Sequence, residues 1–225
     1  MTIKSRREKW RLRMGKLFLY SDQIIESPGN QRLDSLLFNG METEKIKVGY
    51  IPSTQDKDKK YFRTKVDYYQ NYGIADIMFF DLYGEFTSIN INKLMECDII
   101  HLSAGNPIEF RKAIKNRKME QVLWDYYHSG GIIVGVSGGA VQLGQSTALF
   151  HLFKGSDCVE SSDALNMVKF EFLPHYNRWN NDFKQEVLAY SKRTGTRILC
   201  VNDGDGVIVD KENIQMIGYI KVIGG

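Results

Sequence analysis

The 225-residue sequence is poor in cysteine and proline and has no long apolar run, and each scarcity narrows the classes of protein that it can encode. Its three cysteines, Cys97, Cys158 and Cys200, lie far apart without the spacing of a metal site, and no secretory signal is evident. We therefore expect free thiols in a reducing cytoplasm and no bound metal. No apolar run reaches the roughly 18 residues of a membrane-spanning helix, so no membrane partner is expected.

An excess of positive charge is confined to the first residues. The formal net charge is +3, but residues 1–14 hold six Lys/Arg and one Glu, so the rest of the chain is slightly acidic. No face of it is expected to bind phosphate groups, which argues against a nucleic-acid partner. We interpret residues 1–14 as a basic disordered tail, or as sequence upstream of a start at Met14, and residues 15–225 as a single α/β domain. Monomer and homodimer both stay open.

Apolar runs that end at turn residues predict strands alternating with helices. The expected strands are 17–20, 46–51, 76–82, 99–102, 132–136, 167–173, 198–201, 207–209 and 214–217. The expected helices are 31–38, 59–72, 91–96, 108–127 and 181–192. Strands joined by helices need crossover connections, so we predict a mostly parallel sheet with helices on both faces and a hairpin or mixed edge near the C-terminus. In such sheets the reactive loops lie beyond the carboxyl ends of the strands.

A glycine-rich turn, Gly135-Val136-Ser137-Gly138-Gly139, follows an apolar β-branched run and precedes residues that can start a helix. Two interpretations compete. The glycines permit close packing where a strand turns into a helix. The same strand–turn–helix setting is also that of a nucleophile elbow, in which a strained turn exposes a serine hydroxyl. In that case the amide of Gly138 and the helix N-terminus face the position of a developing oxyanion.

A serine nucleophile needs a base, and four histidines are available. His101 lies inside an expected strand, His128 in an expected helix with aromatic neighbours, and His151 in an apolar stretch, so all three are interpreted as structural. His175 directly follows the strand 167–173 and Pro174, which delivers it to the carboxyl edge of the sheet. This placement favours His175 as the base.

The base in turn needs a carboxylate that orients it, and the turn after the strand 198–201 offers two. Asp203 is the first candidate and Asp205 is its rival. Asp-Gly pairs also form turns without any catalytic role. Placement thus favours Ser137, His175 and Asp203, with the choice of aspartate open.

Together these stretches resemble the family of serine peptidases that includes dipeptidase E (aspartyl dipeptidase) and cyanophycinase. The family's G-x-S-[AG]-G-A motif is matched by residues 135–140 and its Pro-His-[FY] motif by residues 174–176. Its acidic residue after a late strand is matched by Asp203, and its strand-then-GGN turn by residues 102–106. The resemblance extends from Lys16 to about Ile217.

The resemblance implies a class I glutamine-amidotransferase-like α/β fold and a triad of Ser137, His175 and Asp203 that acts through an acyl-enzyme, without a cofactor. It also implies oxyanion donors at the amide of Gly138 and in the turn of Ala104 and Gly105. The chain order serine, histidine, acid differs from that of ordinary α/β-hydrolase esterases.

Two further residues are candidates for binding the substrate. Arg178 offers a guanidinium that suits an acidic side chain or a carboxylate, although an exposed arginine before the next helix fits the pattern equally well. Asn106, the last residue of the GGN-like turn, is the second candidate.

The chain departs from the family pattern at three places. Asp203 stands where glutamate is usual and is one methylene shorter, which reduces its reach to His175. Ser103 and Ala104 stand where glycines are usual and could crowd or rotate the second oxyanion donor, whose loss typically lowers the rate by about 10²–10³. Gly138 replaces the commoner alanine, which should be harmless.

The sequence therefore predicts a cytoplasmic serine exopeptidase that hydrolyses short peptides, with bonds next to acidic residues as one class of substrate. The alternative is a catalytically impaired relative that binds a small peptide or carboxylate. A third hypothesis is an amide hydrolase acting on a non-peptide substrate.

Overall fold

The computed structural model describes residues 14–155 and 162–225, so all of the predicted basic tail except Met14 lies outside the described residues, as does Cys158. The strands are β1 (Lys16–Tyr20), β2 (Lys47–Ile51), β3 (Asp76–Phe79), β4 (Ile99–Leu102), β5 (Ile132–Val136), β6 (Glu171–Leu173), β7 (Ile198–Val201), β8 (Gly206–Asp210), β9 (Asn213–Ile217) and β10 (Ile220–Ile223). The helices are α2 (Pro28–Leu37), α3 (Lys60–Gln70), α4 (Ser88–Met95), α5 (Pro107–Asn116), α6 (Met119–His128), α7 (Gly138–Leu143), α8 (Ala148–Phe153) and α9 (Asn181–Thr194), with a short 3₁₀ helix η1 (Thr43–Lys45).

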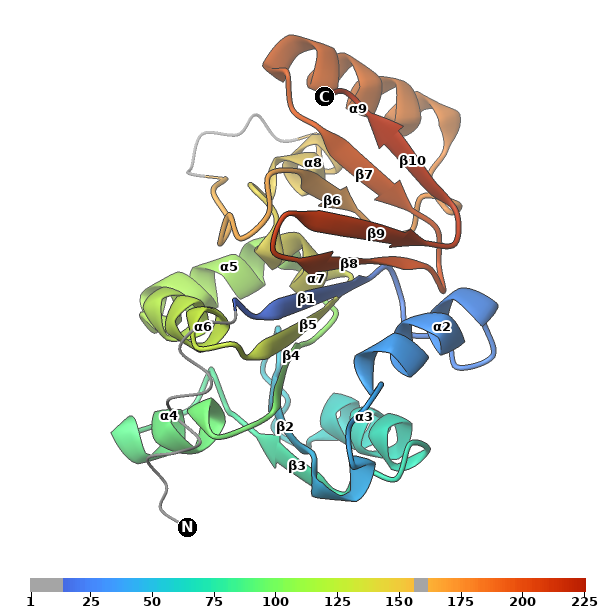
Figure 1. Cartoon of the computed structure of the whole chain (residues 1–225). Helices are drawn as coiled ribbons and strands as arrows, with labels where there is room; N and C mark the ends of the chain where they lie inside the picture. Colours follow the sequence, from blue (N-terminus) through green and yellow to red (C-terminus); the bar gives the residue numbers. More distant parts are fainter. Residues whose placement is uncertain (1–13, 156–161) are drawn as a thin grey trace.

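The larger sheet contains seven strands in the order β3-β2-β4-β5-β1-β8-β9 (Figure 1). Its first five strands are parallel, and β8 then runs antiparallel to β1. The strands β8 and β9 form a hairpin with Val209 opposite Ile214. The predicted α/β fold with a mostly parallel sheet and a C-terminal hairpin is confirmed.

Helices cover both faces of the larger sheet, as the crossover connections require (Figure 1). On one face α2 and α3 contribute Leu33 and Tyr69 to a core with the sheet residue Val134. On the other face α4, α5, α6 and α7 pack, with Leu123 and Leu143 among their buried residues. No helix in the described ranges is long and apolar enough to cross a membrane.

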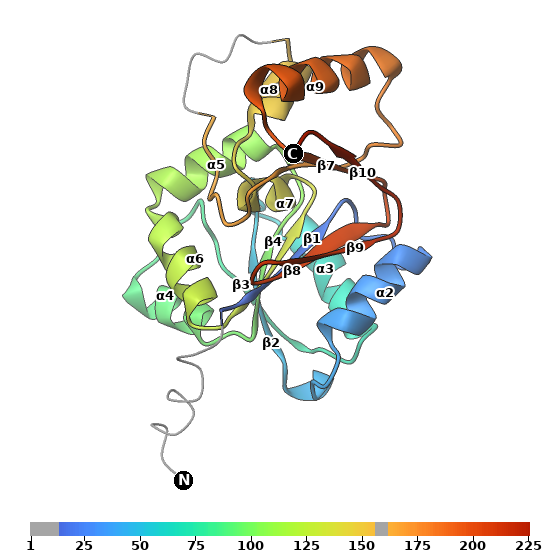
Figure 2. The same cartoon turned by 45° about the horizontal axis from the view of Figure 1, so that its top comes forward.

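A second, three-stranded sheet with the order β10-β7-β6 was not expected from the sequence. The strands 167–173 and 198–201 were expected to belong to the main sheet, but the hairpin β8–β9 occupies the edge beside β1, so β6 and β7 pair with each other in parallel. The unpredicted strand β10 completes this sheet antiparallel to β7. The helices α8 and α9 pack on one face of it, above the large sheet in Figure 2.

Two helical segments also differ from expectation. The single helix expected over 108–127 is two helices, because Lys118 adopts a left-handed conformation with φ of 55° between α5 and α6. The apolar stretch around His151 forms α8, which the sequence analysis left without an element. Its apolar residues lie over the second sheet, whose existence the local pattern does not reveal.

A buried polar cluster fixes α2 and α3 to the sheet. The carboxylate of Asp34 is fully buried and accepts hydrogen bonds from the hydroxyls of Tyr20, Tyr68 and Tyr72 and from the amide of Asn30, at 2.5–2.8 Å. Burial raises the pKa of Asp34, which the three tyrosine hydrogen bonds oppose without cancelling. This carboxylate thus satisfies four donors that have little access to water.

Replacing Asp34 by alanine is expected to lower the free energy of unfolding by about 3 kcal/mol, because it leaves several buried donors without an acceptor. Denaturant unfolding followed by circular dichroism measures the change. The control Asp67→Ala, at an exposed position of α3, should change stability by less than about 0.5 kcal/mol. Equal stabilities of the two variants would contradict this account of the cluster.

Candidate active site

Ser137 lies in the sharp turn between β5 and α7. Its backbone has φ of 49° and ψ of −112°, a region that residues other than glycine rarely adopt. Two backbone hydrogen bonds hold the turn: the amide of Ser137 donates to the carbonyl of Tyr20 at 2.9 Å, and its carbonyl accepts from Val141 at 3.0 Å. The strain at Ser137 is therefore imposed by β1 and by the start of α7, as in a nucleophile elbow.

The glycines around Ser137 are required by close packing. A Cβ atom at Gly135 would lie 2.7 Å from the backbone of Ala140, and one at Gly139 would lie 2.1 Å from the carbonyl oxygen of Leu102. At Gly138 it would lie 2.0 Å from the carbonyl oxygen of Gly105. The packing interpretation of this turn is therefore confirmed, and the same packing holds Ser137 in the strained conformation that the nucleophile interpretation requires.

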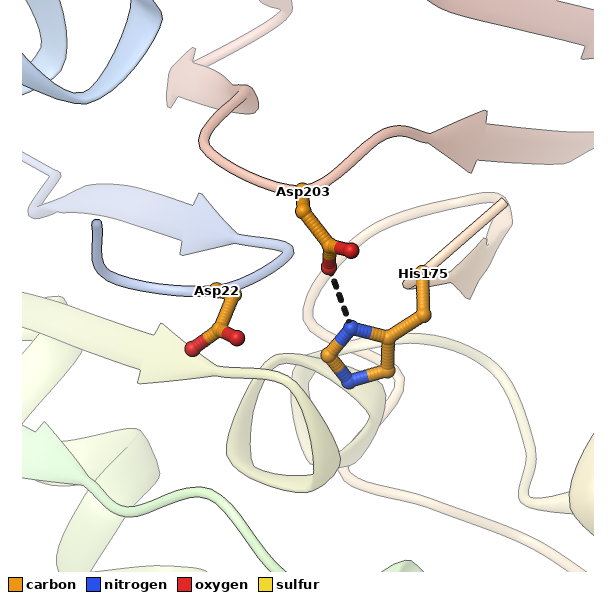
Figure 3. A group of neighbouring side chains, drawn as sticks. All are labelled: Asp22, His175 and Asp203. Carbon is orange, nitrogen blue, oxygen red and sulfur yellow. Dashed lines mark hydrogen bonds and ion pairs between the residues drawn. The ribbon is translucent and has the colours of Figure 1, made fainter. Parts of the chain in front are cut away.

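His175 lies between Ser137 and Asp203. The Oγ of Ser137 is 2.8 Å from Nε2 of His175, and Nδ1 of His175 is 2.6 Å from Oδ1 of Asp203 (Figure 3 shows the second contact). Asp205 instead accepts a hydrogen bond from the amide of Tyr219 at 2.9 Å and serves the turn. Despite its shorter side chain, Asp203 reaches His175.

The two sheet strands that end at this site explain why His175 and Asp203 meet. Both residues follow the carboxyl ends of β6 and β7, which are parallel neighbours, so the two loops start side by side. The amide of Asp203 donates to Oδ1 of Asn177 at 2.9 Å, and the amide of Tyr176 donates to the carbonyl of Val201 at 3.0 Å. These bonds lock the two loops together.

The three other histidines lie on elements that do not carry Ser137, His175 or Asp203. His101 is fully buried in β4, where its Nδ1 pairs with the hydroxyl of Tyr69 at 2.8 Å. His128 lies at the end of α6 with its ring against Trp124. His151 lies on α8.

Charge around Asp203 keeps its carboxylate ionised. Burial by itself raises the pKa of Asp203, but the hydrogen bonds from His175 and Arg178 outweigh it, so the pKa lies below its ordinary value. The guanidinium of Arg178 bridges two carboxylates, with Nε on Asp203 and Nη2 on Asp22 at 3.0 Å. An ionised Asp203 is the form that accepts a hydrogen bond from the Nδ1–H group of His175.

The potential ligand atoms of Asp22, His175 and Asp203 lie within 4.8 Å of one another (Figure 3). The cation of Arg178 already bridges the two carboxylates, and Nδ1 of His175 is engaged with Asp203. These contacts suit the orientation of the imidazole better than the binding of a metal ion.

The turn of Ser103, Ala104 and Gly105 packs against the glycines that follow Ser137, since a Cβ atom at Gly138 would meet the carbonyl of Gly105 and one at Gly139 the carbonyl of Ser103. Ser103 and Ala104 line a second cavity and not the one beside Ser137. The hydroxyl of Ser53 donates to the carbonyl of Ala104 at 2.5 Å, and the amide of Ser53 donates to the hydroxyl of Ser103 at 2.7 Å. In a trans peptide the N–H points opposite to the C=O, so the amide of Gly105 points away from Ser53. Gly105 lines the same cavity as Ser137 and Gly138. Ser103 thus fixes the turn by a hydrogen bond that glycine could not make.

Both residues predicted to bind the substrate have partners within the protein. The side chain of Asn106 caps α5 by accepting hydrogen bonds from the amides of Ile108 and Glu109 at 3.0 and 3.3 Å. Arg178 is engaged with Asp22 and Asp203. Neither residue lines the cavity beside Ser137. Their predicted role in substrate binding is therefore not supported by their contacts.

Sequence reasoning missed Ser21 and Asp22, which follow β1 directly. The buried hydroxyl of Ser21 accepts from the amide of His175 at 2.8 Å and donates to the carbonyl of Val201 at 3.1 Å. It thereby connects the strand beside the elbow to both loops of the second sheet. The available signal was their position at the carboxyl end of the first strand, the same edge that carries Ser137.

A strained serine at a strand–turn–helix junction, paired with a histidine and an ionised carboxylate on an α/β sheet, is typical of serine hydrolases. The sequence model of peptidase family S51 matches residues 17–217. The chain belongs to this family of peptidases, a class of hydrolases, and the predicted resemblance to serine peptidases is confirmed.

Known relatives and structures agree with this assignment. The chain is 30% identical over 105 residues to the uncharacterized peptidase Lmo0363 of Listeria monocytogenes, a match that covers 45% of this chain and 48% of that protein. It is 21% identical over 175 residues to the uncharacterized peptidase YgaJ of Bacillus subtilis, covering 77% and 71% of the two chains. The chain thus spans about half the length of the first of these relatives and more of the second.

Two crystal structures share the fold. A peptidase E-type protein from Listeria monocytogenes EGD-e superposes with a TM-score of 0.70 at 21% identity, covering 94% of this chain and 100% of the other. A peptidase from an acI-B1 actinobacterium gives a TM-score of 0.69 at 14% identity, covering 96% and 89%. At these identities the likeness concerns the fold.

Proposed function

We propose that this protein is a serine exopeptidase of the dipeptidase E type, which hydrolyses short peptides with Ser137 as nucleophile, His175 as base and Asp203 as the orienting acid. One observation carries the proposal: the unbroken series of contacts from Ser137 Oγ to His175 Nε2 at 2.8 Å and from His175 Nδ1 to Asp203 at 2.6 Å. Such a series supplies the base that a serine hydroxyl needs in order to attack a carbonyl.

The proposed reaction proceeds in two halves. His175 takes the proton of Ser137 as Oγ attacks the carbonyl carbon, and the amides of Gly138 and Gly105 receive the developing oxyanion. His175 then gives this proton to the nitrogen of the departing amine as the C–N bond breaks, which leaves an acyl-enzyme. Water, deprotonated by His175, attacks the ester, and Ser137 recovers its proton when the acid leaves.

Arg178 has a positioning role in this proposal. Its ion pairs with Asp203 and Asp22 orient the carboxylate that holds His175, and they satisfy the guanidinium within the protein. Recognition of an acidic substrate residue by Arg178, which the sequence suggested, would require these ion pairs to break.

The competing proposal is a binding module that has lost catalysis. Its support came from the sequence, in which Asp203 stands where glutamate is usual and Ser103 and Ala104 stand where glycines are usual. Asp203 nevertheless lies at 2.6 Å from His175, and the turn is held by Ser53 and Ser103 with Gly105 in the cavity of Ser137. These contacts favour the enzyme.

Cytoplasmic location and a small-peptide substrate complete the proposal. Cys97 and Cys200 are free and buried, which suits a reducing compartment.

Treatment with a fluorophosphonate followed by intact-mass analysis tests the nucleophile. Wild-type protein is expected to gain one adduct, and Ser137→Ala none. The control Ser146→Ala removes another hydroxyl that lines the same cavity and should keep the adduct. Absence of labelling on folded wild-type protein would favour the binding module. Labelling that persists in Ser137→Ala would show that another residue is the nucleophile.

A further inference from the structure

A cavity of about 190 Å³ opens directly beside Ser137 and His175. For comparison, an engineered apolar protein cavity of roughly 150 Å³ is large enough to bind benzene. The cavity can therefore hold one aromatic ring or a branched aliphatic side chain next to the reacting atoms.

The lining of this cavity is predominantly apolar and aromatic. The helix α8 contributes Leu149, Phe150 and Phe153, and the loop and helix after His175 contribute Trp179 and Phe183. The ring centroids of Phe153 and Trp179 are 4.6 Å apart, and those of Trp179 and Phe183 are 4.8 Å apart, so these walls form one packed aromatic cluster. Among the described residues, no Asp, Glu, Lys or Arg side chain lines the cavity.

A neighbouring cavity does have charged residues in its lining. A second cavity, of about 340 Å³, is lined by Lys65, Asp56 and several hydroxyl-bearing residues, and it shares Gly105 with the first. An acidic group beside Ser137 would thus enter a cavity whose lining, as far as the described residues form it, holds no cationic side chain, and a buried unpaired carboxylate is strongly disfavoured.

We propose that the cavity beside Ser137 receives a large apolar side chain, aromatic or leucine-like, of the substrate residue that flanks the bond to be cleaved. This inference rests on the proposed function of Ser137 for its catalytic meaning. It replaces acidic residues by apolar ones as the preferred substrate class.

The size of the preference follows from burial. Full burial of a phenylalanine or leucine side chain favours binding by about 10- to 100-fold over a side chain that stays in water. Aspartate at the same place gains nothing from the apolar walls and loses the hydration of its charge.

Calorimetric binding to the Ser137→Ala protein tests the inference without turnover. The probes are two pairs of dipeptides, Phe-Ala with Asp-Ala and Ala-Phe with Ala-Asp, because the cavity can hold the residue on either side of the bond. The phenylalanine member of at least one pair is expected to bind about 10-fold or more tightly than its aspartate counterpart. Equal affinities, tighter aspartate binding or no binding in both pairs would overturn the inference.

Substitutions at Phe150, which is partly exposed, link the preference to this cavity. In the Ser137→Ala background, Phe150→Ala should weaken binding of the preferred phenylalanine dipeptide about 10-fold, and Phe150→Arg should shift the preference toward its aspartate counterpart. The control Tyr61→Ala removes an aromatic ring that lines the second cavity and should leave the affinities unchanged. An unaltered preference in both Phe150 variants would place the binding site elsewhere and overturn the assignment.

Failure of this inference and failure of the proposed function give different results. Fluorophosphonate labelling of Ser137 together with tighter aspartate binding would leave the peptidase intact and refute the apolar preference. A phenylalanine preference in calorimetry without any labelling would retain the cavity assignment and refute the nucleophile.

Discussion

Replacing His175 by alanine is expected to lower kcat by about 10⁶, the loss seen when a serine hydrolase loses its base. The reason lies in the 2.8 Å contact between His175 Nε2 and Ser137 Oγ. Without the imidazole, the hydroxyl proton of Ser137 has no acceptor. In the proposed mechanism His175 also returns this proton to the leaving amine, so both halves of the proposed reaction depend on it.

The effects on kcat of substitutions at His175 and at Ser137 should not be additive. Because the nucleophile and the base act as a unit, His175→Ala, Ser137→Ala and the double variant are expected to have nearly the same residual kcat. Steady-state kinetics on a short peptide that wild-type protein cleaves, at saturating substrate, measures this.

His128→Ala is the matched control, because it removes a histidine of α6 that stacks on Trp124 and does not contact Ser137. Its kcat should stay within about twofold of wild type, since surface changes usually have small effects. A His175→Ala enzyme that retains a tenth or more of the wild-type kcat would refute the assignment of the base.

Replacing Asp203 by asparagine is expected to lower kcat by about 10⁴ while the fold is retained. Asparagine has nearly the same shape, but its amide can donate to Nδ1 of His175. The imidazole would then carry its proton on Nε2 and could not accept one from Ser137. The 2.6 Å contact of Asp203 with Nδ1 is the geometric basis of this expectation.

Asp205→Asn is the matched control in the same turn, since Asp205 accepts from the amide of Tyr219 and an asparagine oxygen can do the same. We expect kcat of Asp205→Asn to stay within about threefold of wild type. If instead Asp205→Asn lost activity and Asp203→Asn kept it, the choice between the two aspartates would have to be reversed.

The lowered pKa of Asp203 also determines how the difference in folding stability between wild type and Asp203→Asn varies with pH. A carboxyl whose pKa is lower in the folded state contributes stability above its unfolded pKa and loses it as the pH falls through the folded value. The stability advantage of wild type over Asp203→Asn should thus be present at neutral pH and disappear on acidification below the ordinary aspartate range.

Local pattern in the sequence was sufficient for the strands of the larger sheet and for the position of most helices, and it indicated the candidate reactive groups, but it revealed neither α8 nor β10. Apolar runs with turn residues at their ends placed the strands of the larger sheet, because the spacing of apolar residues and the length of each run indicate a strand from a few neighbouring residues alone. The run before Ser137 and the small residues after it predicted a strand–turn–helix junction, and position after a strand singled out His175 among four histidines. Each of these inferences uses neighbours in the chain.

Only the tertiary structure decided which strands share a sheet and which side chains from distant segments meet. The sequence could not show that 171–173 and 198–201 leave the main sheet, since the pairing of β10 with β7 and the place of β8 beside β1 are long-range. It made Asp203 the first candidate but kept Asp205 as a rival, and the different contacts of the two arise from the parallel pairing of β6 with β7.

The same reason explains contacts of individual side chains that the sequence could not show. Arg178 could have faced a substrate, yet its partners Asp22 and Asp203 come from segments distant in sequence, and only the fold brings all three together. Likewise α8, α9 and β6 give no sign of a shared cavity in the sequence, and they line a cavity with aromatic walls beside Ser137 because the second sheet brings them together there. The sequence thus determined which groups are candidates for the reaction, whereas the packing of distant segments determined which of these side chains touch and what surrounds them.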